Sequence, residues 1–269
     1  MSPRRPLRLA AQLVKMNVML TMEYRVGFFI AMVNLVLRPA IALLVWLTVA
    51  RAGVRLPYDR EQFVTYFVLM GLVSLATQTW TWEYVAADIR RGDLNKVLVR
   101  PAPHVLHYIC NNLGEKVVKL GLLLPPIAAM VLVFHDQIRV PADPLRWALF
   151  GSAVVLAAVL TFLVDYLMGS LAFWLQDVSG AVGVKRLLEG LLAGRLVPLA
   201  LFPEWMAGFL EAQPFRYLLS FPLEVLTADL PAAALARGFA WQAAYCLALV
   251  GAYRLLWRHG LRSYAASGA

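Results

Sequence analysis

Residues 63–103 read "FVTYFVLMGLVSLATQTWTWEYVAADIRRGDLNKVLVRPAP". Residues 63–80 contain no Asp, Glu, Lys or Arg, and a helix of about 20 apolar residues is long enough to cross the hydrocarbon core of a bilayer. Residues 83–103 are instead rich in charged and polar side chains. This abrupt change predicts a transmembrane helix that leads directly into a long element exposed to water.

The composition of the whole chain fits a membrane protein with several spans. Its 269 residues are 61% hydrophobic and 15% charged, with a mean hydropathy of +0.67, whereas soluble domains are near half apolar and a quarter charged. The net charge of +9 could suggest nucleic acid, but the basic residues lie in short clusters beside apolar runs, which is the pattern of membrane topology. We therefore expect a lipid bilayer and no nucleic acid as a partner.

Six segments are long and apolar enough to span a bilayer. They are residues 26–49, 63–80, 105–134, 145–175, 182–202 and 239–257. The chain has no linker, low-complexity tract or internal repeat, so we expect one all-α transmembrane domain over residues 1–269.

The distribution of Lys and Arg sets the expected orientation. With the N-terminus in the cytoplasm, the inner segments hold about 15 basic residues and the outer loops about 7, and an excess of basic residues marks the cytoplasmic side. This predicts a multi-pass protein of the cytoplasmic (inner) membrane with both termini inside. Residues 83–103 then lie in the cytoplasm.

The N-terminal segment has its own helical pattern. Leu9, Leu13, Met16 and Leu20 recur at helical spacing, with charged residues off that stripe. We expect an interfacial amphipathic helix over residues 7–24, along the cytoplasmic surface. The alternative is a simple extension of the first span.

Residues 203–231 are too apolar for an ordinary loop, and Pro203, Pro214 and Pro222 prevent one straight span. Non-helical backbone at membrane depth is tolerated only where protein or water satisfies it. The sequence therefore predicts a helical hairpin of two short re-entrant helices that dip into the outer leaflet.

Residues 82–91, "WEYVAADIRR", predict an amphipathic helix, because Trp82, Val85 and Ile89 fall on one helical face. Gly92 is then a plausible helix stop, followed by a second short turn. An apolar stripe in a polar region of this length, residues 82–100, suggests docking against a partner. The alternative is an ordinary solvated loop.

These residues carry a family resemblance. "DIRRGDLNKVLVRPAP" after the second span resembles the coupling region of the permeases of type-2 ATP-binding-cassette (ABC) exporters, and more narrowly the six-span branch often encoded as paired permeases. "GLLAGRLVPLALFP" (190–203) and "PFRYLLSFPLEVL" (214–226) resemble that branch's fifth span and its outer re-entrant hairpin, with Pro203, Pro214, Phe215 and Pro222 as hairpin residues. The resemblance covers nearly the whole chain in order.

The resemblance implies a permease that dimerises with a second permease, either the same chain or a related one. It implies a cytoplasmic coupling helix, at about residues 84–93, that sits in a cleft of a separate ATPase subunit and drives export of an amphipathic or apolar substrate. The residues expected to touch the ATPase subunit are Tyr84, Asp88, Ile89, Arg90, Arg91, Asp93 and Leu94. The chain has no G-x-x-x-x-G-K-[ST] phosphate loop, so we expect it to bind no cofactor and the partner to use ATP and Mg.

Asp165 lies well inside the fourth segment, where a carboxylate is expensive and normally faces protein, a counter-charge or water. Lys119 of the third segment and Arg38 of the first are possible counter-ions, and we favour Lys119. The pair could form part of a substrate path, or it could lock two helices together. Alternatively, the carboxyl is protonated and hydrogen-bonds to Tyr166 or Ser170.

Two other classes of function remain as alternatives. An ion-gradient-driven secondary transporter would show inverted repeats with paired broken helices, and here the breaks cluster after the fifth segment. An intramembrane enzyme would need a nucleophile or metal set, and neither G-x-S-x-G nor H-E-x-x-H is present. His104 and His107 lack further nearby ligands, so we expect no metal site and no catalytic residue.

Overall fold

The computed structural model describes residues 25–52, 58–99 and 103–264. These residues form helices and connecting turns, with no strand among them, which confirms the expected all-α class. The predicted interfacial helix, residues 7–24, lies outside the described residues.

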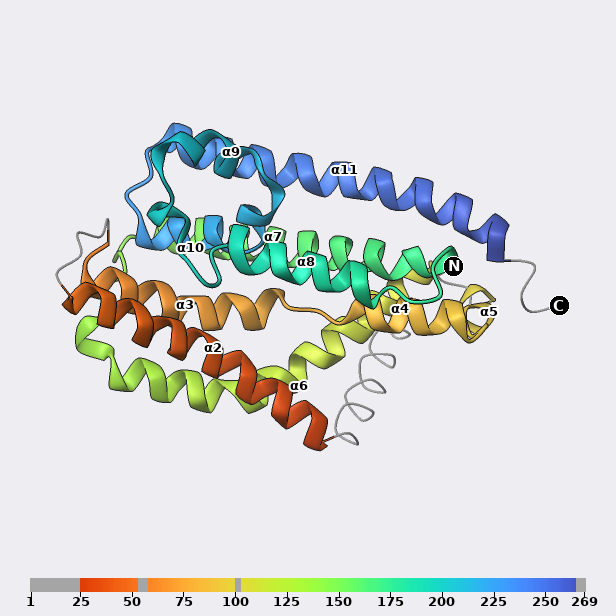
Figure 1. Cartoon of the computed structure of the whole chain (residues 1–269), viewed down its shortest axis with the longest axis horizontal. Coiled ribbons are helices and arrows are strands. Elements are labelled where there is room, and N and C mark those ends of the chain that lie inside the picture. The colour runs from red at the N-terminus through yellow and green to blue at the C-terminus, as the bar shows by residue number, and fades with distance from the viewer. Residues whose placement is uncertain (1–24, 53–57, 100–102, 265–269) are drawn as a thin grey trace.

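Five helices form the body of the molecule and run along its long axis (Figure 1). Shorter helices connect them. The long helices are α2 (Arg25–Arg51), α3 (Arg60–Thr77), α6 (His104–Val133), α7 (Pro144–Ser170) and α11 (Ala232–Tyr264), and the shorter ones are α4 (Thr81–Arg90), α5 (Leu94–Leu98), α8 (Ser179–Leu192), α9 (Ala207–Ala212) and α10 (Ser220–Thr227). Single 3-10 turns lie at His135–Gln137, Leu171–Phe173, Leu199–Leu201, Glu204–Met206 and Pro214–Leu218 (η1 to η5).

Local sequence signals explain where α3 and α7 begin. The Asp59 side chain accepts from the Gln62 amide, and the Gln62 side chain accepts from the Asp59 amide, which makes a capping box at the start of α3. Asp143 caps α7 and is followed by Pro144 at the first helical position, where proline loses no hydrogen bond.

Helix α7 lies at the centre of the packing, against α11, α4, α10 and α3. Two apolar clusters hold the molecule together. The first, at the end where α3 and α7 begin, contains Phe63, Phe67 and Phe221, and the second, at the other end, contains Val85, Tyr166 and Trp257. The second cluster joins the short α4 and α5 to the long helices.

The observed helices can be compared with the six expected segments. Three helical runs are apolar and long enough to cross a membrane: Arg60–Arg90, Pro144–Phe173 and Ala232–Tyr264, and Pro39–Val49 is a shorter apolar helix. These helical runs were found among the described residues alone. The fourth segment, expected to reach residue 175, leaves the α-helix at Ser170.

The fifth segment differs most from expectation. Helix α8 covers Ser179–Leu192, about 21 Å at 1.5 Å per residue, and the backbone leaves the helix where residues 193–202 were expected to continue it. Gly194 has φ = 81°, a conformation that residues with a side chain adopt only at a cost. The hydropathy of residues 182–202 therefore does not correspond to one continuous helix, and several of its apolar side chains, such as Val184 and Leu187, are exposed.

Candidate functional site

The polar stretch after α3 folds as two short helices joined by a glycine. Helix α4 spans Thr81–Arg90 and α5 spans Leu94–Leu98, with Gly92 at φ = 77° between them. The predicted amphipathic helix and its stop at Gly92 are therefore confirmed. We call α4 and α5 together the α4–α5 segment.

The apolar face of this segment is buried against the chain's own helices. Val85, Ile89 and Leu94 lie in one cluster with Tyr166 of α7 and Trp257 of α11. The closest approach is at Gly169 of α7, where a Cβ atom would lie 2.7 Å from the Trp82 carbonyl oxygen and 2.8 Å from the Val85 Cβ. The α4–α5 segment is thus fixed firmly to α7.

The polar face of the segment is exposed. Of the seven residues expected to contact an ATPase subunit, Tyr84, Arg90 and Arg91 are exposed, and Asp88 and Asp93 are half-buried. Ile89 and Leu94 are buried, at 6% and 0% exposure, so as placed they support the fold and present no surface to a partner. The sequence showed the helical periodicity of these two residues, but it did not show that their face packs against helices of the same chain.

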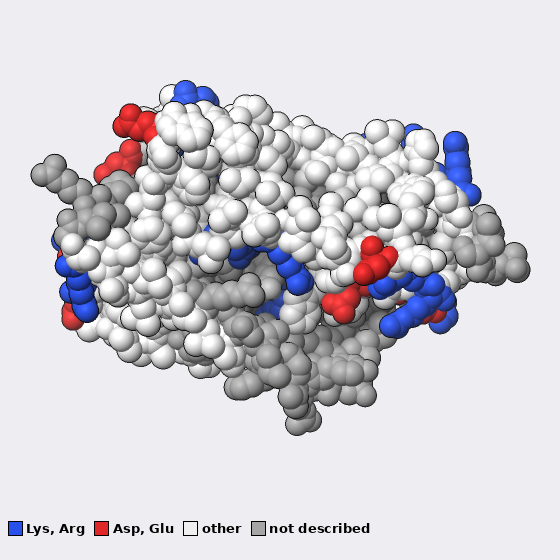
Figure 2. Space-filling model, in the orientation of Figure 1, with Lys and Arg blue, Asp and Glu red and all other residues white. Residues whose placement is uncertain are grey.

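Sequence reasoning missed part of this exposed face. Leu98 and Val99 are apolar and are 39% and 82% exposed, beside the exposed Asn95 and Lys96. Leu98 lies one helical turn after the buried Leu94, a spacing that predicts burial on the same face, so periodicity alone gave no signal for its exposure. Acidic and basic atoms gather at this end of the molecule, whereas most of its middle is uncharged on the face shown (Figure 2).

Hydrogen bonds fix the charged residues of the segment. The Tyr108 hydroxyl donates to Asp88 Oδ2 (2.9 Å), and Arg90 Nη1 donates to the Gln176 carbonyl oxygen (3.3 Å). Burial raises the pKa of the Asp88 carboxyl, and the hydrogen bond from Tyr108 opposes that shift. Lys96 pairs with Asp93 (2.5 Å) on the exposed side.

The expected pair of Asp165 and Lys119 is wrong. Asp165 of α7 pairs with Lys185 of α8, and Lys185 also pairs with Glu189 one turn later (2.9 Å). Asp165 is 1% exposed, so the cation offsets the desolvation of a buried carboxylate. The antiparallel neighbour that brings a cation to the depth of Asp165 is α8 and not α6.

Lys119 has a partner on its own helix. It is fully buried, pairs with Glu115 one turn earlier, and its Nζ lies 4.4 Å from the centroid of the Trp80 ring. Both buried pairs are therefore internal to the fold.

The hairpin region, residues 203–231, folds back as short helices. Pro203 precedes η4, Pro214 and Phe215 begin η5, and Pro222 lies in the first turn of α10. Arg216 and Glu224 join η5 to α10 through a half-buried ion pair (2.6 Å). Its entry into a lipid leaflet stays a prediction.

Three side chains that sequence reasoning missed cap the C-terminal end of α8. The Gln213 amide donates to the Leu192 carbonyl oxygen (2.8 Å), the Ser220 hydroxyl to that of Ala193 (3.0 Å), and the Tyr66 hydroxyl to that of Gly194 (3.0 Å). These groups replace the backbone partners that a continuing helix would supply. They explain how α8 can end within an apolar part of the chain.

The described residues form an apolar helical bundle whose second long helix, α3, leads into a charged, outward-facing helical segment. Over residues 35–268, the chain matches the model of a family described as "ABC-2 family transporter protein". The chain belongs to this family. It is therefore a membrane-embedded transport permease, as the resemblance of residues 88–103 implied. Among curated proteins, comparison gives no match.

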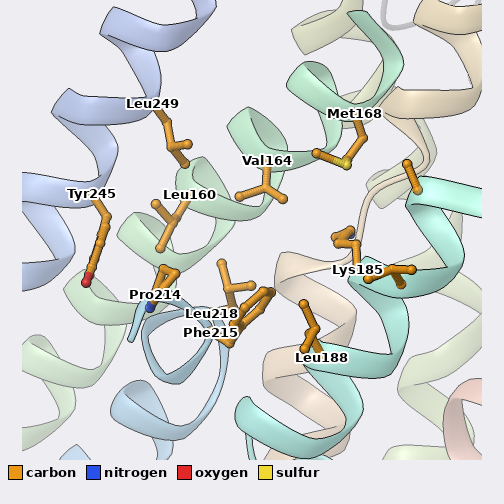
Figure 3. Close-up of a pocket in the computed structure, with 12 residues that line it drawn as sticks. Leu160, Val164, Met168, Lys185, Leu188, Pro214, Phe215, Leu218, Tyr245 and Leu249 are labelled. Carbon is orange, nitrogen blue, oxygen red and sulfur yellow. The ribbon is translucent and has the colours of Figure 1, made fainter. Parts of the chain in front are cut away.

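This ABC-2 transporter chain also contains an apolar cavity of about 490 Å³ (Figure 3). Side chains from α7, α8, η5 and α11 converge on it, among them Val164, Leu188, Phe215 and Leu249. Lys185 lines it with its methylene stem, since its ammonium group pairs with Asp165 and Glu189. A cavity of this size and lining suits an apolar group.

Metal-binding side chains do not gather in the described part of the transporter, where no group of three His, Cys, Asp or Glu residues could hold an ion. His104 instead stacks on Trp257, with ring centroids 4.1 Å apart, and its Nε2 lies 2.6 Å from the Tyr253 hydroxyl. This histidine joins α6 to α11.

Proposed function

We propose that the chain is the six-span permease subunit of an ATP-driven exporter, and that the α4–α5 segment docks on a separate ATPase subunit. The observation that carries the proposal is the division of this segment into two faces in a chain of the ABC-2 family. Its buried face fixes it to α7 through Gly169, and its exposed face presents Tyr84, Arg90 and Arg91.

The proposed mechanism follows from this attachment. ATP and Mg bind in the ATPase subunits, and closure of those subunits pushes the α4–α5 segment. Because the segment is packed against α7 without free space at Gly169, the push reaches the long helices as a rigid-body movement. Interfaces that are close-packed transmit displacement because they do not compress.

The proposed topology places both termini in the cytoplasm of an inner-membrane protein. The six spans are residues 26–49, 63–80, 105–134, 145–175, 182–202 and 239–257, of which the fifth is the short α8 completed by non-helical backbone. Residues 203–231 then re-enter the outer leaflet. The capping of α8 by Gln213, Ser220 and Tyr66 supports this arrangement, because such backbone must be satisfied by protein at membrane depth.

The proposed assembly contains two permeases, either two copies or this chain with a related one. The transported substrate is amphipathic or apolar, which the apolar cavity between α7, α8 and α11 supports. Export requires the ATPase partner, and a chain that carried out gradient-driven flux alone would instead be a secondary transporter.

The test is ATP hydrolysis by the co-purified complex of the chain and a cassette ATPase encoded beside it. Charge reversal of two exposed residues, Arg90→Glu with Arg91→Glu, should leave the permease folded and should lower its association with the ATPase and its stimulation of hydrolysis at least tenfold. The matched control is Arg51→Glu, an exposed residue at the opposite end of the molecule, which should change neither. Unchanged stimulation in the double variant would contradict the docking surface.

A further inference from the structure

Basic side chains gather around the end of α3 and the start of α4. We call Lys116, Lys119, Arg186 and Arg195 the basic cluster. Lys116 Nζ donates to the carbonyl oxygens of Ala76 (2.5 Å), near the end of α3, and of Gln78 (3.3 Å), the residue that follows the helix. The other three cations lie against residues of the same short stretch, 74–82.

Each of these three has a different contact. Lys119 lies over the Trp80 ring, Arg186 lies over the Trp82 ring with its Cζ 5.7 Å from the centroid, and Arg195 Nη1 donates to the Ser74 hydroxyl (3.3 Å). Two cations come from α6 and two from α8 and the chain after it. On the face shown in Figure 2, basic atoms are visible in a hollow at the middle of an otherwise mostly uncharged surface.

The cluster reaches from the cytoplasmic boundary to membrane depth in the proposed topology. Ser74 is 14 residues beyond Arg60, where α3 begins, which corresponds to about 21 Å along the helix. The hydrocarbon core is about 30 Å thick, so Arg195, which contacts Ser74, lies in its inner half. Arg186 lies over Trp82, about 33 Å from Arg60 along the helix, and is therefore at the cytoplasmic boundary. Charged groups at membrane depth normally face protein partners, water or a pathway.

The cluster has more positive charge than its protein partners neutralise. Among the described residues, Lys119 alone of the four pairs with a carboxylate, that of Glu115, whereas Lys116, Arg186 and Arg195 contact carbonyl oxygens, a ring and a hydroxyl. The carboxylates of Asp165 and Glu189 already pair with Lys185. The Arg195 Nε is buried and has no hydrogen-bond partner within the described part of the chain.

The solvent exposure of the four side chains decreases from one end of the basic cluster to the other. Arg186 is exposed, Lys116 and Arg195 are half-buried, and Lys119 is fully buried. Uncompensated positive charge in a poorly polar environment favours binding of an anion, and the planar guanidinium group matches the oxygen geometry of carboxylate and phosphate. The rings of Trp80 and Trp82 provide apolar surface beside the charges.

We propose that the basic cluster binds the anionic headgroup, a carboxylate or phosphate, of an amphipathic substrate. The inference rests on the proposed function and adds the charge of the transported molecule. The anion would occupy the hollow beside α8, with the half-buried Arg195 inside it and Arg186 at its exposed cytoplasmic entrance, and the apolar part of the substrate would lie along the surrounding helices.

Thermal unfolding of the purified full chain in a neutral detergent tests binding. The probes are oleate, dioleoyl phosphatidic acid, oleyl alcohol and inorganic phosphate. Oleate and the phosphatidic acid should raise the melting temperature in a saturable way, and oleyl alcohol and inorganic phosphate should not. An equal rise with oleyl alcohol would overturn the requirement for an anion, and an equal rise with phosphate would overturn the requirement for an amphiphile.

Substitutions locate the site. Arg186→Gln and Arg195→Gln should each weaken the apparent affinity for oleate about tenfold, the loss typical of a charge-assisted hydrogen bond. The matched control, Arg258→Gln, removes an exposed arginine of α11 and should leave the affinity unchanged. Equal affinities for all three variants would contradict the proposal.

The test of anion binding and the test of the proposed function can fail independently. Stimulation of the ATPase by the chain, measured without any probe, tests coupling through the α4–α5 segment alone. Coupling without oleate binding would refute the anionic substrate and leave the exporter function standing. Oleate binding without any association with an ATPase would refute the proposed function.

Discussion

Substitution of Gly169 by alanine should loosen the contact between α4 and α7. The added Cβ would lie 2.7 Å from the Trp82 carbonyl oxygen, 2.8 Å from the Val85 Cβ and 2.9 Å from the Trp82 Cα. Two of these are backbone atoms, which cannot rotate away, so α4 itself must retreat. Ordinary contacts between such atoms begin at about 3.5 Å, and the retreat is therefore close to 1 Å.

The size of the effect follows from this overpacking. Added methyl groups in a close-packed interior destabilise by about 1–3 kcal/mol. For a protein of this size, 1 kcal/mol corresponds to about 2–4 °C in melting temperature, so Gly169→Ala should melt about 2–12 °C below a variant with the same substitution at a helical glycine that lacks this contact. The same displacement should lower stimulation of ATP hydrolysis, because the segment that we propose to dock on the ATPase would lose its close contact with α7.

Gly151→Ala on the same helix is the matched control. Gly151 is exposed, and its added Cβ would meet no atom within 4 Å. Both substitutions gain helix propensity, by about 1 kcal/mol, so only the contact with α4 distinguishes them. Thermal unfolding of both variants in detergent is the assay, and equal melting temperatures would refute the close contact.

Three further predictions concern buried polar groups. Lys185→Met leaves Asp165 and Glu189 without their cation and should destabilise the chain by about 3–5 kcal/mol in thermal unfolding. The control Lys96→Met removes an exposed pair with Asp93 and should change stability by less than about 0.5 kcal/mol. Similar losses of stability in both variants would refute a buried ion pair. Tyr66→Phe removes the donor to the Gly194 carbonyl oxygen and should destabilise by about 1–3 kcal/mol, and an unchanged melting temperature would show that this cap of α8 is dispensable. Burial raises the pKa of Asp88 in the folded chain, so the folded state binds the proton more tightly and its stability should fall as pH rises through that pKa. In Asp88→Asn this contribution should be absent from melting curves recorded between about pH 4 and pH 7. Identical pH profiles for the variant and the unchanged chain would contradict the prediction.

The parts of the fold that depend on local sequence could be predicted. Helix α4 and its stop at Gly92 follow from side-chain periodicity and one glycine, and both lie where expected. The partner of Asp165 could not be predicted in this way, because it depends on which helix brings a cation to the same depth. That helix, α8, is itself shorter than its apolar run suggested.

The end of α8 shows why the remainder needs the structure. An apolar sequence does not reveal that its backbone is satisfied by Tyr66, a residue 128 positions earlier in the chain. In the same way, periodicity identified Ile89 and Leu94 as members of one stripe, but only packing shows that the stripe faces α7 and α11. The proposed contact surface for a partner is instead the opposite face.

The central claim is that the exposed face of the α4–α5 segment lies in the cytoplasm and is covered by an ATPase subunit. It is tested most directly by labelling Arg91→Cys, in a chain whose Cys110 and Cys246 are replaced by serine, with a membrane-impermeant maleimide. We predict labelling in inside-out vesicles, none in right-side-out vesicles, and protection of the inside-out vesicles when the ATPase subunit is added. Labelling from the outer side, or equal labelling with and without the ATPase subunit, would contradict the account.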